Sequence, residues 1–70
     1  MVYTAIIRTN SERFECDYTN KRKALTDIRE RMRYDYPFNN DVNAALYCND
    51  KQILSLIRYA NEKRIYTWML

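Results

Sequence analysis

The chain has 70 residues, of which 47% are apolar and 30% charged, and its formal net charge is +3. This length allows one small domain, expected to span residues 1–70, and the apolar fraction excludes a disordered tail. No apolar run approaches the roughly 18 residues of a membrane-spanning helix, and the N-terminal residues lack a secretory pattern. We therefore expect a cytoplasmic protein with no membrane partner.

Histidine and glycine are both absent from the chain. Without histidine the commonest acid–base residue is missing, and Ser11 and Ser55 have no imidazole to activate them. Without glycine, the phosphate-binding loops that depend on it are excluded. We expect no catalytic residues, no cofactor and no enzymatic activity. Carboxylate–metal chemistry, for example at Glu15 and Asp17, is the remaining enzymatic alternative.

The two cysteines, Cys16 and Cys48, are too few for a disulfide scaffold. Both lie at apolar positions of predicted strands, which favours free and buried thiols. One disulfide is the alternative. Two thiolates cannot complete a tetrahedral zinc site within a chain that has no histidine, so we expect no metal.

The first two predicted elements are strands that form a hairpin. Val2–Thr9 is rich in β-formers and ends at a turn signal, Asn10-Ser11. Arg13–Tyr18 alternates apolar and charged residues, which is the period of a half-buried strand.

A helix is predicted from Lys21 to about Tyr36, capped by Thr19 or Asn20. The helix should end there because Pro37 disfavours a helical conformation of the residue before it. The apolar residues of one face recur with helical spacing. They are Ala24, Leu25, Ile28, Met32 and Tyr36.

Three more elements complete the prediction. Val42–Cys48 alternates like a strand, and Asp50 is placed to cap a second helix from Lys51 to about Glu62. Arg64–Leu70 is rich in β-formers and is predicted as a final strand, with Asn61 ending the helix before it. The alternative is that the second helix continues to the last residue.

These elements predict an α+β fold, a two-layer sandwich in the order β-β-α-β-α-β. Two helices would pack on one face of a small mixed four-stranded sheet, because two amphipathic helices can cover only one face. Each strand–helix–strand passage would be a right-handed parallel crossover. The other face of the sheet would be open to water or to a partner.

The excess positive charge lies in the predicted first helix, and at 100° per residue three arginines form a stripe beside its apolar face. They are Arg22, Arg29 and Arg33. Such a stripe can bind phosphates or a partner's carboxylates. The alternative is a solvated face with local ion pairs, such as Asp27–Arg31 and Glu30–Arg33.

Ten of the 70 residues are aromatic, and seven of these are tyrosine. If Ile65 and Met69 face the helices, alternation places several aromatic and arginine side chains on the open face. This predicted platform comprises Arg13, Tyr47, Arg64, Tyr66 and Trp68. It could stack bases or form the centre of a protein interface. The alternative is that Tyr66 and Trp68 lie in the core.

The leading hypothesis is a non-catalytic protein-interaction module, and the alternative is a small nucleic-acid-binding domain that uses the helical arginines and the aromatic platform. About 40% of the residues are types written with AT-rich codons. Together with the small size, this makes the chain similar in general character to inhibitor and adaptor proteins of phages and mobile elements. Such a protein would occlude a host protein in the host cytoplasm. An apolar terminal strand at a sheet edge would also allow a homodimer.

Overall fold

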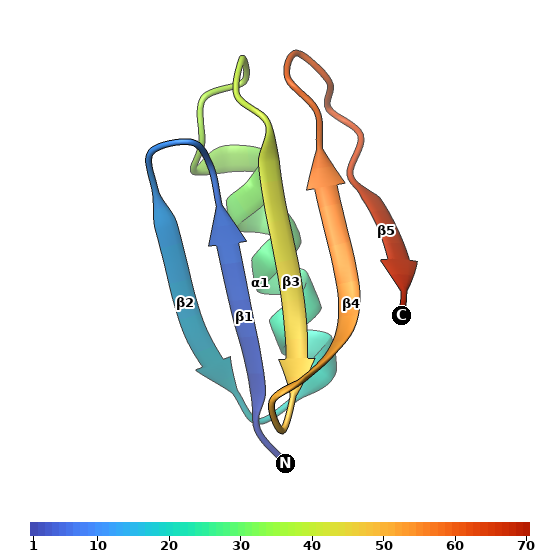
Figure 1. Ribbon diagram of the computed structural model, residues 1–70. Helices are drawn as coiled ribbons and strands as arrows, with labels where there is room; N and C mark the ends of the chain where they lie inside the picture. The colour runs from blue at the N-terminus through green and yellow to red at the C-terminus, as the bar shows by residue number, and fades with distance from the viewer.

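The structure, a computed structural model, describes residues 1–70 as one antiparallel sheet with a single helix against one face (Figure 1). The elements are β1 (Tyr3–Arg8), β2 (Arg13–Tyr18), α1 (Lys21–Tyr34), β3 (Val42–Cys48), β4 (Lys51–Arg58) and β5 (Tyr66–Met69). The five strands lie in the order β2-β1-β3-β4-β5, and every neighbouring pair is antiparallel. The predicted mixed four-stranded sheet with two helices is therefore wrong.

The predicted second helix is strand β4, because the chain reverses direction at Asn49 and Asp50. Both residues have positive φ, 50° and 70°. Cys48 pairs with Lys51 across them. Two central residues with positive φ are typical of the tight hairpin turn that matches the twist of its strands, and Asn and Asp tolerate this backbone better than most residues. Asp50 is therefore a turn residue and caps no helix.

A bulge in the β3–β4 pair explains why the strand period was hidden. Leu46 pairs with Leu54, but Tyr47 pairs with Gln52, so Ile53 is an extra residue in β4. An extra residue breaks strict alternation. The resulting spacing of apolar residues also fits a helix, and only pairing with β3 selects the strand.

The one helix connects β2 to β3. These strands are parallel to each other, because both are antiparallel to the β1 strand that separates them. The side chain of Asn20 caps the helix by accepting a hydrogen bond from the Lys23 backbone N–H at 3.1 Å. The helix ends at Tyr34, two residues before the predicted end at Tyr36. The second predicted crossover is replaced by two antiparallel connections, and Asn61 lies in the β4–β5 loop with φ of 64°.

The core lies between α1 and the sheet, and α1 packs mainly against β1, β2 and β3. Its ten buried apolar residues are Ala5, Ile7, Ala24, Ile28, Met32, Val42, Ala44, Leu46, Leu54 and Leu56. Burial of these side chains is the main stabilising contribution in a domain of this size.

One arginine, Arg58 at the end of β4, is buried with the core at 2% exposure. It has no carboxylate partner and donates only to backbone carbonyls. Its acceptors are the carbonyls of Met32 at 2.9 Å, Pro37 at 3.1 Å, Phe38 at 3.3 Å and Glu62 at 3.4 Å. The C-terminal end of a helix favours a cation. Arg58 therefore joins the end of α1 to the loop before β3 and the loop before β5.

A second cluster joins α1 to the edge strand β2. The Arg31 guanidinium lies over the Phe14 ring, 4.1 Å from its centroid, and its Nε donates to the Asp27 carboxylate at 2.9 Å. The Tyr18 hydroxyl also donates to Asp27. Desolvation acts to raise the pKa of Asp27, but the hydrogen bonds from Tyr18 and Arg31 outweigh it, so this pKa lies below its usual value. Partial burial and the bond to Asp27 raise the pKa of Tyr18.

Candidate interaction surfaces

The sheet face opposite α1 is uncovered along its whole width (Figure 1). Its β2 side is charged, and the charges are satisfied locally. Arg13 pairs with Glu15 at 2.9 Å, and the Thr4 hydroxyl donates to Asp17 at 2.8 Å. The part formed by β3, β4 and β5 is different because strand pairing places only uncharged side chains on it. These are Asn43, Ala45, Tyr47, Gln52, Ser55, Ile57, Tyr66 and Trp68. We call this region the aromatic half of the open face.

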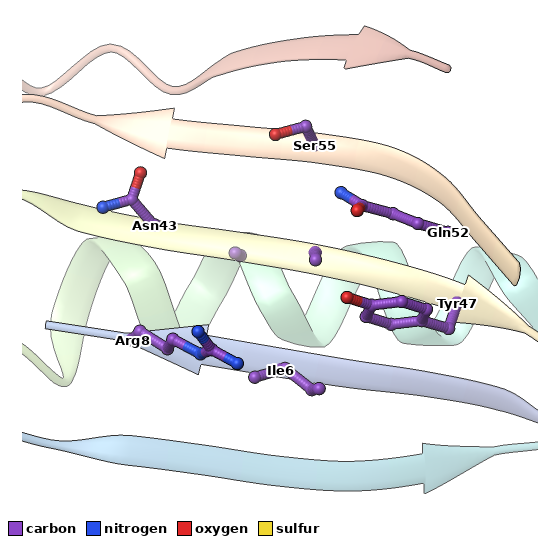
Figure 2. A pocket seen from close by; sticks show the side chains of 8 residues that line it. Ile6, Arg8, Asn43, Tyr47, Gln52 and Ser55 are labelled. Atoms are coloured by element: carbon purple, nitrogen blue, oxygen red, sulfur yellow. The ribbon is translucent and has the colours of Figure 1, made fainter. Parts of the chain in front are cut away.

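A cavity of about 240 Å³ lies on the open face over β1, β3 and β4 (Figure 2). Arg8 and Asn43 lie at one end of it, and Tyr47 and Gln52 lie at the other, with Ser55 along the β4 side. Ligand pockets usually have about 300–1,000 Å³. This cavity is smaller than that range.

A larger hollow of about 630 Å³ lies at the β5 end of the molecule. Tyr59 and Tyr66 meet there edge to face, with ring centroids 5.8 Å apart. The Arg64 guanidinium lies 5.0 Å from the Tyr66 ring centroid. Trp68 forms part of the same hollow and is 47% exposed. A large aromatic side chain is thus left in water beside a stacked arginine.

The structure brings together most of the residues of the predicted platform. Tyr66 pairs with Ile57, and Trp68 pairs with Ser55, so both aromatic side chains lie on the open face with Tyr47. The alternative that places Trp68 in the core is wrong. The binding role of these residues stays a prediction.

The helical arginines lie on the other side of the sheet. Arg22, Arg29 and Arg33 are exposed and form no ion pair. The predicted Asp27–Arg31 pair is present, and Arg31 also pairs with Asp35 at 3.4 Å. The Glu30–Arg33 pair is absent. Because α1 covers the face opposite the aromatic half, one ligand cannot use the arginine stripe and the aromatic platform as a single flat surface.

Sequence reasoning missed four polar residues of the open-face cavity: Arg8, Asn43, Gln52 and Ser55. Alternation along β1 and β3 places Arg8 and Asn43 on the open face, so that signal was present. Gln52 was hidden by the bulge at Ile53.

Both cysteines are free, as predicted, although Cys16 and Cys48 are half-buried rather than fully buried. No group of three or more Cys, Asp or Glu side chains is placed to hold a metal ion. The one helix is too short and too polar to cross a membrane.

Three comparisons with known proteins gave no match. No family model matches the sequence, and neither a curated protein nor a solved structure is significantly similar to the chain.

Proposed function

We propose that this protein is a non-catalytic protein-binding module whose contact surface is the aromatic half of the open face. The observation that carries the proposal is a charge-free group of aromatic and small polar side chains on an uncovered sheet. The centres of protein interfaces are depleted in charge and enriched in Tyr, Trp and Arg. Exposed Trp68 is the strongest single feature, because a large aromatic surface gains free energy when a partner removes it from water.

The size of the open face suits one partner. The molecule measures 35 × 21 × 18 Å along its principal axes. The two longer extents enclose the whole open face, including its charged β2 side, so the aromatic half alone is smaller than the roughly 800 Å² that each partner buries in a standard interface. A partner of ordinary interface size would cover the cavity at Tyr47 and the hollow at Trp68 together.

Two arginines that flank this surface suggest the charge of the partner. Arg8 borders the cavity at the end opposite Tyr47, and Arg64 is stacked on Tyr66 with no carboxylate partner. An arginine held in place by stacking loses less freedom when it binds a carboxylate. We expect the partner to present an apolar centre with acidic groups at its rim. Such a module would act by occluding or remodelling its partner, as a small phage inhibitor or adaptor does.

The test is affinity capture from the source cell with the wild-type chain and with the Tyr47→Ala and Trp68→Ala variants, each with and without nuclease. We expect one partner protein that survives nuclease and is lost with either variant. The matched control changes Arg22, Arg29 and Arg33 together to Gln and should keep the partner. Equal capture by the wild-type chain and Trp68→Ala would overturn the proposal.

A second candidate function is nucleic-acid binding through α1 alone, and the unpaired cations favour it. Arg22, Arg29 and Arg33 face solvent, while Asp27 and Asp35 are both engaged by Arg31. If the three free arginines contact three phosphates, log affinity should fall against log salt with a slope of about −2 to −3. The triple Gln variant should flatten that slope. Absence of binding to DNA or RNA at about 50 mM salt would remove this candidate.

A further inference from the structure

The edge strand β5 carries a row of backbone groups without partners. The Leu70 N–H donates to the Ile53 carbonyl at 3.1 Å, so Leu70 points toward β4. In an antiparallel strand, successive residues direct their backbone groups to opposite sides. Tyr66 and Trp68 therefore bond to β4, and the N–H and C=O groups of Thr67 and Met69 point away from the sheet.

The side chains of β5 do nothing to block this edge. Natural proteins protect edge strands with charges, proline or a covering element. Residues 65–70 contain no charged residue and no proline. Met69 is 74% exposed, and α1 lies away from β5 (Figure 1). The opposite edge strand, β2, is charged on its open-face side and is held to α1 by Arg31 and Asp27.

We infer that β5 pairs antiparallel with β5 of a second copy of this chain around a two-fold axis at Thr67. This register places Thr67 opposite its own copy and Ile65 opposite Met69, so all the outward-pointing residues find partners. About six backbone hydrogen bonds would form.

The same register is favourable for the side chains. Tyr66 comes directly opposite Trp68 of the second copy, at a position without hydrogen bonds, where cross-strand side chains are closest. Aromatic cross-strand pairs stabilise antiparallel sheets. No like charges face each other between Ile65 and Met69. The contact is self-complementary, which a two-fold dimer requires.

Edge pairing of this kind keeps both helices on the same side of one continuous sheet. The aromatic halves of the two copies then adjoin at β5, which makes a single wider open face. Tyr66 and Trp68 belong to both surfaces, but Tyr47 and the cavity lie away from the paired edge, so Tyr47→Ala tests the proposed function without changing the dimer contact.

Light scattering of the purified chain tests the dimer. At tens of micromolar, we expect the wild type to approach twice the chain mass of 8.6 kDa and to dissociate on dilution. The Thr67→Lys variant puts two like charges opposite each other and should be monomeric at every concentration. The Thr26→Lys variant adds the same charge on exposed α1 and should still dimerise. A monomeric wild type, or a dimer that persists in Thr67→Lys, would overturn the inference.

Cysteine cross-linking tests the register and separates this inference from the proposed function. With a short thiol-reactive cross-linker, Thr67→Cys should be joined to residue 67 of the second copy, since the two Cα atoms lie about 5.5 Å apart. Met69→Cys faces Ile65 and should not link to itself. Peptide mapping distinguishes these links from Cys16 or Cys48. A dimer without the 67–67 link would overturn the register, whereas loss of the partner in Tyr47→Ala concerns the proposed function alone.

Discussion

The two edge strands of the sheet, β2 and β5, differ in how far the rest of the chain contacts their aromatic and polar groups. On the β2 side, Phe14 is covered by Arg31, and Tyr18 donates to Asp27. On the β5 side, Trp68 and Met69 remain in solvent, and the outer backbone groups of the strand have no partner. β2 and β5 are both edge strands, but side chains of α1 contact Phe14 and Tyr18, whereas Trp68 and Met69 stay exposed. We therefore expect substitutions in the Phe14, Tyr18 and Asp27 cluster to act mainly on stability, and substitutions on β5 to act mainly on the proposed binding.

The largest expected effect comes from Arg58, which holds the loop before β3 and the loop before β5 together. Arg58→Ala would remove the guanidinium hydrogen bonds to four backbone carbonyls and open a cavity at the end of α1. The carbonyls of Pro37 and Phe38 would keep backbone donors, the N–H groups of Asn40 and Asn61. We expect a loss of about 3 kcal/mol or more in the free energy of unfolding. Urea denaturation measures it. A loss below about 1 kcal/mol would show that water replaces the guanidinium without cost.

Trp68→Ala tests the role of β5, because we expect it to lower partner affinity far more than it lowers the free energy of unfolding. A well-placed interface tryptophan contributes about 2 kcal/mol or more, so we expect at least about a 30-fold loss of partner affinity. The free energy of unfolding should change by less than about 1 kcal/mol, because the ring is half in solvent. Calorimetry of partner binding and urea denaturation give the two values. Equal effects on both would mean that Trp68 is structural.

Asp27→Asn tests the cluster that joins α1 to β2. The folded-state pKa of Asp27 is depressed, so its stabilising contribution is present above the unfolded pKa of about 4 and is lost as pH falls through the folded value. We expect wild type to be more stable by about 1 kcal/mol at pH 7 and the difference to disappear in acid. Urea denaturation from pH 7 to pH 2 measures this. A difference that stays constant with pH would contradict the assigned role.

The smallest expected effect is at the turn that determines β4. Asp50 has φ of 70°, a conformation that glycine adopts without steric cost. Asp50→Gly should therefore stabilise the fold by about 0.5 kcal/mol, while Asn49→Val should destabilise it, because β-branched residues disfavour positive φ. Thermal unfolding compares the two. Destabilisation by both variants would show that the Asp50 side chain has a role of its own.

Several elements could be predicted from sequence because their signals are local. Arg13–Tyr18 and Val42–Cys48 were predicted with the bounds that the structure has, since alternation within six or seven residues is enough to define them. The start of α1 was predicted from its cap at Asn20. Lys51–Arg58 was predicted wrongly because the extra residue at Ile53 breaks the alternation that would have identified a strand.

The sequence by itself determined which side chains share a strand face, and so that Tyr66 and Trp68 lie together on the side opposite Met69. It also determined that the chain must turn without glycine, which Asn49 and Asp50 achieve. Tertiary structure alone decided that β5 lies at an edge and that Arg58 is buried. Both depend on groups far apart in the chain, such as the Met32 carbonyl 26 residues from Arg58. Local patterns carry no information about such pairings, because strand order and the positions of distant carbonyls are set only when the sheet and the helix pack together.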